Sequence, residues 1–208
     1  MDKGRSVLLK YIPENAVDQV LQLIYSHREL SLKIKKSRTT KLGDYRQVSK
    51  HRHNISVNYN LNPYQFLLTL LHETAHFLTY KKYGKRVKPH GAEWKQVFGE
   101  LLTPYLTPDI FPKDLLPDLL QYAKNPKAST AGDGTLYLKL SGYNVDQNKN
   151  TKYVFQLAKG DIFRLQNGQS FQLQEKRRTR YKCLNLDNKK TYLIHGNAEI
   201  FPVLTDKT

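Results

Sequence analysis

The stretch from Leu70 to Leu78, which reads Leu-Leu-His-Glu-Thr-Ala-His-Phe-Leu, constrains the fold of this chain more than any other. His72 and His76 are four residues apart, so on an α-helix both imidazoles leave the same face one turn apart. Two imidazoles held in this way can bind one zinc ion, and Glu73 beside them can act as general base on a water at the metal. Because the motif is short, two hydrogen-bonded core histidines are the alternative interpretation.

The neighbouring residues predict a helix from about residue 63 to residue 80. Asn62 suits the N-cap position, and Pro63 fits the first helical position. The remaining surface of this helix is apolar, as expected for a helix in a protein core. The apolar residues are Leu67, Leu68, Leu70, Leu71, Ala75 and Leu78.

A catalytic zinc site normally takes three protein ligands, and His90 is the leading candidate for the third. It lies at the junction between a loop and the next helix, and Gly91 beside it removes side-chain bulk where the backbone must come near the site. Trp94 begins the apolar stripe of that helix and favours this choice, because it would fix the second helix against the first. Glu93 and Glu100 are the alternative ligands. The other histidines, His27, His51, His53 and His195, are expected at the surface or in an ordinary hairpin.

Upstream of the motif the sequence predicts one helix and a few strands. Residues 13–30 show helical spacing of apolar residues, and alternation predicts strands near Leu32 and near Ile55. Between residues 31 and 52 there are eight Lys or Arg residues and one acid, Asp44. Such a run is either a solvated face or a substrate-binding wall.

Downstream of the motif the pattern changes from helical to alternating. Prolines interrupt residues 104–126 and leave room for one short helix near residues 115–122. We therefore divide the chain into a first domain (1–128), a linker (129–134) and a small β domain (135–208). The predicted strands are 136–140, 153–157, 171–173, 181–186 and 192–194, with hairpin turns at Asn167-Gly168 and Asp187-Asn188.

The formal net charge of +16, from 34 Lys and Arg against 18 Asp and Glu, favours a polyanionic partner, with nucleic acid as first candidate. The alternative is a basic protein that has no such partner. The single cysteine, Cys183, excludes an intramolecular disulfide and a cysteine-based zinc ribbon. We expect a soluble cytoplasmic protein with no membrane association, since no apolar signal core or membrane-spanning stretch is present. Nothing in the sequence indicates the oligomeric state.

The densest positive cluster lies in a predicted hairpin of the β domain. Its basic groups could neutralise phosphates, and Tyr181 could stack on an unpaired base. The alternative is a solvated hairpin whose charges prevent edge-to-edge aggregation. The candidate nucleic-acid-binding residues are Lys176, Arg177, Arg178, Arg180, Tyr181 and Lys182.

Four segments, in order, resemble the SprT family of zinc metalloproteases, which includes the eukaryotic protease Spartan. They are residues 40–46, 55–58, 70–76 and 90–94, and the resemblance covers about residues 10–105. It implies an α+β fold with a small zincin-type core, in which helices pack on a short antiparallel sheet, followed here by the small all-β domain. It also implies that His72, His76 and His90 bind Zn²⁺ and that Glu73 is the catalytic glutamate.

The resemblance further implies an activity, because Spartan-like members cleave proteins covalently trapped on DNA. We therefore expect a zinc-dependent endopeptidase that acts on DNA-bound or DNA-crosslinked proteins, a role in DNA repair. The alternative is a DNA-binding or transcription-associated protein whose zinc site is structural or only weakly catalytic. Many family members carry a zinc ribbon built on paired cysteines after the protease core. This chain has only Cys183, so its mode of DNA binding stays open.

Overall fold

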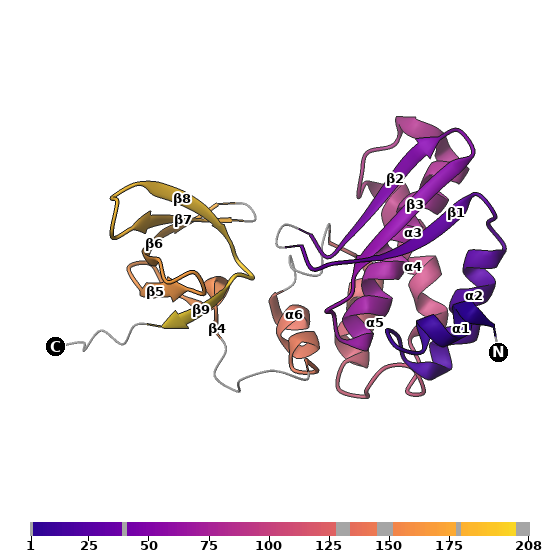
Figure 1. Ribbon diagram of the computed structural model, residues 1–208, viewed down its shortest axis with the longest axis horizontal. Coiled ribbons are helices and arrows are strands. Elements are labelled where there is room, and N and C mark those ends of the chain that lie inside the picture. The colour runs from indigo at the N-terminus through magenta and orange to yellow at the C-terminus, as the bar shows by residue number, and fades with distance from the viewer. Residues whose placement is uncertain (1, 39–40, 128–133, 145–151, 178–179, 203–208) are drawn as a thin grey trace. The chain divides into compact units, whose positions relative to one another are not determined.

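The computed structural model describes residues 2–38, 41–127, 134–144, 152–177 and 180–202. Its contacts divide the chain into two compact units, residues 1–145 and residues 146–208. Within the described ranges the fold is α+β, as expected, with a three-stranded sheet A in the first unit and a six-stranded sheet B in the second (Figure 1). No helix in the described part of the chain is long and apolar enough to cross a membrane.

The helices of the first unit include the predicted motif helix. Asn62 caps it as expected, because its side-chain oxygen accepts a hydrogen bond of 3.0 Å from the Gln65 amide. The predicted helix over residues 13–30 is shorter, because a 3₁₀ turn follows Pro13 and the α-helix ends at Tyr25. The helices are α1 (Lys3–Leu8), α2 (Val17–Tyr25), α3 (Pro63–Tyr83), α4 (Ala92–Leu102), α5 (Leu116–Lys124) and α6 (Gly134–Ser141), with 3₁₀ turns at Glu14–Ala16, Gly84–Arg86 and Thr103–Tyr105.

Sheet A consists of β1 (Leu30–Lys35), β2 (Gly43–Ser49) and β3 (Arg52–Asn58) in the order β1-β3-β2. The sheet is mixed, which corrects the expectation of an antiparallel sheet: β1 pairs with β3 in parallel, and β2 pairs with β3 antiparallel. Strand β3 lies between β1 and β2 in the sheet and follows β2 through a hairpin, so it runs antiparallel to β2 and parallel to β1.

The inner face of sheet A packs on α3. Leu32 pairs with Ile55 and Ile34 with Val57, so the apolar residues of the two strands share this face. Helix α3 also packs against α4, so most of its surface is buried, and Figure 1 shows the strands lying across these two helices. The metal-motif helix is therefore the centre of the first unit.

Helix α6 corrects the predicted strand over residues 136–140. Leu136 and Leu140, four residues apart, are both buried in the core of the first unit. Asn62 fixes this helix by donating a 2.8 Å hydrogen bond to the Leu140 carbonyl oxygen. Leucines at every second position look like a strand, but the first and third of them are also spaced i, i+4, as on one face of a helix. Packing of that face on the core stabilises the helix instead of the strand. Of the predicted linker only Gly134 is described, and it begins α6.

The second unit is a small β structure in which neighbouring strands are antiparallel. Both predicted hairpin turns are confirmed: Asn167-Gly168 joins β5 to β6, where Gly168 has φ +82°, and Asp187-Asn188 joins β7 to β8. Only the start of the predicted strand 153–157 is extended, because a 3₁₀ turn follows at Val154–Gln156. The strands are β4 (Lys152–Tyr153), β5 (Ile162–Leu165), β6 (Ser170–Lys176), β7 (Arg180–Asn185), β8 (Thr191–His195) and β9 (Glu199–Pro202), in the order β4-β9-β5-β6-β7-β8.

Candidate metal centre

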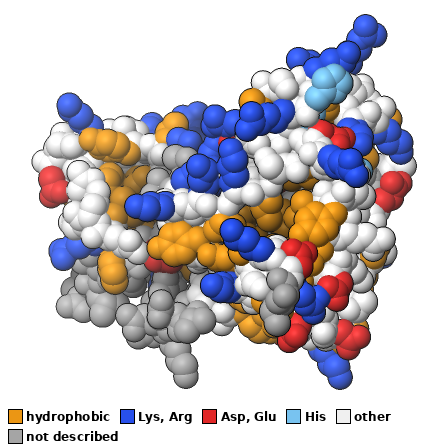
Figure 2. Space-filling view, turned by 45° about the vertical axis from the view of Figure 1, so that its right-hand side comes forward, with side chains coloured by type: hydrophobic (Ala, Val, Ile, Leu, Met, Phe, Trp, Pro, Cys, Tyr) orange, Lys and Arg blue, Asp and Glu red, His pale blue; other side chains and the backbone are white. Residues whose placement is uncertain are grey.

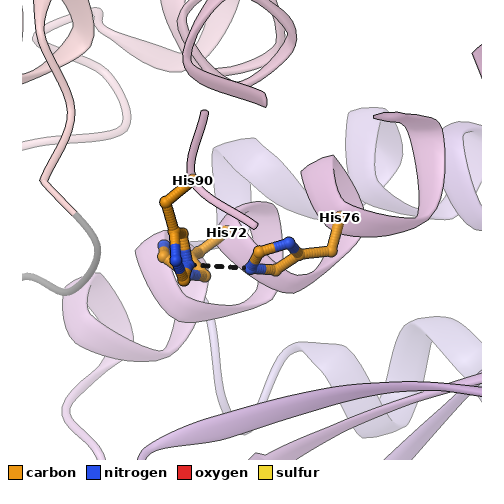
Figure 3. A group of neighbouring side chains, drawn as sticks. All are labelled: His72, His76 and His90. Atoms are coloured by element: carbon orange, nitrogen blue, oxygen red, sulfur yellow. Dashed lines mark hydrogen bonds between the residues drawn. The ribbon is translucent and has the colours of Figure 1, made fainter. Parts of the chain in front are cut away.

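Three histidines converge at one point of the first unit (Figure 3). His72 and His76 lie one turn apart on α3, and His90 comes from the turn that precedes α4. The Nε2 atom of His90 is 3.1 Å from Nε2 of His72 and 3.0 Å from Nε2 of His76. Among the described residues, Glu93 and Glu100 are not part of this metal-binding group.

The distances within the triad fit a metal ion. Three nitrogens bound tetrahedrally to zinc at 2.0–2.1 Å would be about 3.3 Å apart. Burial lowers the pKa of His72 well below its ordinary value and the pKa of His76 to about 4, and it also lowers the pKa of His90. The imidazoles are therefore neutral near pH 7, which is the form that binds metal. The donor set of three imidazoles suits zinc.

A tight turn presents His90 to the other two histidines. His90 has a positive φ of 60°, a conformation that few residues other than glycine adopt. The Gly91 amide donates a 2.9 Å hydrogen bond to the Lys88 carbonyl oxygen and closes the turn. A Cβ atom on Gly91 would lie 2.9 Å from the Lys88 carbonyl oxygen and 3.2 Å from Glu93 Oε2. Glycine is therefore needed here for the turn itself, rather than for an approach to the metal site as the sequence suggested.

Trp94 forms the floor beneath the triad. Its indole ring is 1% exposed, and its ring centroid lies 4.6 Å from His72, 5.2 Å from His76 and 4.7 Å from His90. Phe98, one turn along α4, stacks on Trp94 at 5.0 Å with an angle of 6° between the ring planes. The aromatic stripe of α4 thus supports all three imidazoles from one side.

Glu73 is buried beneath β2, with 9% of its surface exposed. Burial raises the pKa of its carboxyl group to about 8, the nearby Asp44 carboxylate adds to the rise, and a hydrogen bond from the Tyr45 backbone opposes it. Strand β2 can pass this close because residue 43 is glycine: a Cβ atom there would lie 2.8 Å from both Cγ and Oε1 of Glu73. The carboxyl group is consequently held in one place by the strand above it.

Two further residues lie at the site although the sequence did not predict them there, His53 and Tyr45. His53, expected to be solvated, is only 2% exposed, and its Nδ1 atom lies 2.9 Å from the Tyr45 hydroxyl oxygen. The Tyr45 ring in turn lies nearly parallel to the His76 ring, 6.4 Å away. The alternation of β3 could have predicted that His53 is buried, because His53 lies on the same side of the strand as the buried Ile55 and Val57.

A model of the SprT-like family matches residues 8–109. The expected similarity to the SprT-like family is therefore shown for these residues. The matched range contains the three histidines and Glu73, so the similarity to this family suggests a metallopeptidase-like function for a group of histidines that can hold a metal ion. A comparison with solved structures found no match.

The basic hairpin lies in the second unit, outside the SprT-like range. Tyr181 is 7% exposed and belongs to the apolar core of sheet B, so the expectation that its ring stacks on a base is wrong. The reason is the alternation of β7, which turns Tyr181 and Cys183 inward. Arg178 lies outside the described residues. The other predicted nucleic-acid-binding residues are cations that solvent can reach: Lys176, Arg177 and Arg180 are exposed, and Lys182 is half-buried.

Proposed function

We propose that this chain is a zinc-dependent endopeptidase of the SprT-like type, with His72, His76 and His90 as zinc ligands. The observation that carries the proposal is the convergence of three neutral imidazoles next to a buried carboxyl group, that of Glu73. A site needed only for structure would have no use for a buried carboxyl group beside its first ligand, because burying an acid is costly.

The roles of the residues follow from their surroundings. Zinc at the triad would polarise the scissile carbonyl and lower the pKa of a water molecule. Glu73 would accept a proton from the attacking water and deliver it to the leaving amine. A carboxylate held in a low-dielectric site is a strong base, as the raised pKa of Glu73 indicates, and a nearby cation would keep it ionised. Gly43 and the Tyr45 backbone fix the position of this base.

We propose proteins bound or crosslinked to DNA as substrates. The support is the net charge of +16, which attracts the chain to nucleic acid and so to the proteins on it. In this scheme DNA raises the local concentration of the substrate, and cleavage of a protein without DNA is slower.

Comparison of the wild type with Glu73→Gln tests the proposal. Each protein is given a DNA-crosslinked protein and, separately, casein without DNA, and bound zinc is measured by atomic absorption. We expect equal zinc in both proteins, cleavage by the wild type alone, and faster cleavage of the crosslinked substrate. Glu100→Gln is the matched control, because Glu100 is exposed on α4 and accepts a hydrogen bond from Gln96 instead of facing the triad.

Two outcomes would contradict the proposal. Cleavage by Glu73→Gln at the wild-type rate would show that Glu73 is not the base. Absence of cleavage by the zinc-loaded wild type on both substrates, with DNA binding retained, would indicate a nucleic-acid-binding protein whose zinc site is structural.

A further inference from the structure

The outer face of sheet A is polar and basic. In the register of the sheet, Lys33 of β1 lies beside Ser56 of β3, and Lys35 lies beside Asn58. These residues alternate with the apolar residues of the inner face, so they point away from α3. Lys33 and Lys35 are exposed, and on the other side of β3 the exposed Arg46 pairs with Asn54. Hydroxyl and amide groups therefore form the middle of this face, with cations on both sides.

Arg38 lies across the middle of the face and is held there by neutral groups. Its Nε donates a 2.8 Å hydrogen bond to Asn58 Oδ1, and its Nη1 donates a 3.1 Å hydrogen bond to Ser56 Oγ. Asn58 also donates to the carbonyl oxygens of Arg38 (3.3 Å) and Lys41 (2.8 Å), which ties both of these residues to β3. Among the described residues the guanidinium group makes no ion pair, and its Nη2 atom is buried without a hydrogen-bond partner. The position of this positive charge is thus fixed without its being neutralised.

The acid on this face is already neutralised. Asp44 forms ion pairs with Lys41 at 2.7 Å and with Arg46 at 2.6 Å. Within the described part of the chain, Lys33 and Lys35 have no acidic partner, so the face carries an excess of positive charge. Figure 2 shows Lys and Arg side chains gathered in the upper part of the face it draws, with few acidic side chains among them.

An exposed aromatic residue follows the end of β3, beside the end of β1. Tyr59 follows β3, its backbone amide donates a 2.9 Å hydrogen bond to the Lys35 carbonyl oxygen, and it is 53% exposed. Cations beside an exposed aromatic ring are the combination that binds single-stranded nucleic acid, because phosphates meet the cations and unpaired bases stack on the ring. A membrane surface fits less well, since Val48 is the single strongly exposed large apolar side chain on the described strands of sheet A.

We propose that the outer face of sheet A binds single-stranded nucleic acid, with Lys33 and Lys35 contacting phosphates, the Arg38 charge attracting them from beneath, and Tyr59 stacking on a base. This inference deepens the proposed function, because it places the nucleic-acid contact in the same unit as the metal centre rather than only in the basic hairpin of the second unit.

The test uses the full chain and measures binding of a fluorescent single-stranded DNA oligonucleotide by anisotropy over a series of salt concentrations. Each phosphate contact on a single strand contributes about 0.7 to the slope of log affinity against log salt, so Lys33→Gln/Lys35→Gln should lower the slope by about 1.4. Between about 50 mM and about 200 mM salt, the variant should therefore lose roughly sevenfold less affinity than the wild type. Lys10→Gln/Lys113→Gln is the control, with the same change of charge at two exposed lysines outside sheet A.

Tyr59→Ala tests the stacking contact. We expect it to weaken single-strand binding roughly fivefold or more and to leave binding of the corresponding duplex unchanged, because bases in a duplex are already stacked. Tyr25→Ala is the matched control, since Tyr25 is 56% exposed and lies on α2, outside the sheet. Unchanged zinc content and circular dichroism show that each variant is folded.

Three results would overturn the inference: an unchanged salt slope in the sheet variant, an equal change in the control pair, or loss of binding to phosphatidylserine vesicles with oligonucleotide binding unaffected. None of these measurements depends on catalysis. Failure of the proposed peptidase activity is therefore distinguishable from failure of this binding surface.

Discussion

Gly43 on β2 lies so close to Glu73 on α3 that a methyl group added to Gly43 would be 2.8 Å from the carboxyl oxygen Oε1. The same methyl group would be 2.6 Å from Cγ2 of Thr69, one turn earlier on the helix. Strand and helix are therefore in contact at the candidate base itself, and the absence of a side chain at residue 43 sets its position.

We predict that Gly43→Ala lowers kcat roughly 10- to 100-fold while zinc content stays the same, because the added methyl group displaces Glu73 and leaves the histidines in place. Overpacking should also lower the free energy of unfolding by about 1–3 kcal/mol. Peptidase assays, zinc analysis and urea unfolding measure the three quantities.

A second substitution separates the two contacts. Thr69→Ser removes the Cγ2 atom, so Gly43→Ala/Thr69→Ser should recover part of the lost stability but little of the lost activity. Recovery of full activity in the double variant would show that Glu73 is not displaced by the methyl group.

The sequence was sufficient to predict the metal-motif helix and its partners. Asn62 and Pro63 mark the start of α3 through local chemistry, and the i, i+4 spacing of His72 and His76 fixes their common face. His90 could be proposed because few candidate ligands follow the motif. These features depend on residues that are close together in the sequence, so they can be predicted from one sequence.

Features that depend on long-range packing could not be predicted. The leucines of α6 alternate as in a strand, and only contact with the core of the first unit determines that they form a helix. Tyr181 was expected to stack on a base because cations surround it in the sequence, but the pleat of β7 turns its side chain into the core. Gly43 carries no signal of its own, because its role appears only when β2 lies across Glu73.

The backbone of His90 allows a prediction about stability without metal. Because φ is +60° at this residue, an alanine would be strained there and a glycine would not. We expect His90→Gly and His90→Ala to lose zinc equally, and the metal-free Gly variant to be more stable than the Ala variant by about 1 kcal/mol. Urea unfolding in the presence of a chelator measures the difference. An Ala variant as stable as the Gly variant would mean that the turn relaxes to an ordinary conformation.

Trp94 provides a direct signal of metal binding. It is the only tryptophan of the chain, and its ring contacts all three histidines. Cobalt, which is paramagnetic, should therefore quench the fluorescence of the metal-free protein until one equivalent is bound. We expect His76→Ala to remove this saturable quenching and His51→Ala, an exposed histidine outside the triad, to retain it. Saturable quenching in the His76 variant would place the metal elsewhere.

The metal-free protein should be most stable near pH 6.5, because the histidines and Glu73 act in opposite directions. The triad histidines have folded-state pKa values below the ordinary 6.5, so the unfolded chain binds more protons there and stability falls as the pH drops below 6.5. Glu73 has a pKa raised from 4.5 to about 8, so the folded state holds the extra proton and stability falls as the pH rises through this interval. Between pH 4.5 and pH 6.5 the three histidines outweigh the one carboxyl group. As the pH rises above 6.5 the unfolded histidines lose their remaining protons, so the effect of Glu73 comes to dominate.

Glu73→Gln isolates the second effect. Between pH 6.5 and pH 8, chelator-treated wild type should lose on the order of 2 kcal/mol of unfolding free energy relative to chelator-treated Glu73→Gln. Below pH 6.5 both proteins should lose stability, and the variant more steeply, because it lacks the opposing carboxyl group. Urea unfolding at half-unit steps of pH measures both curves. Parallel curves above pH 6.5 would show that the Glu73 carboxyl group is already ionised without metal, and that the low-dielectric surroundings inferred for it are wrong.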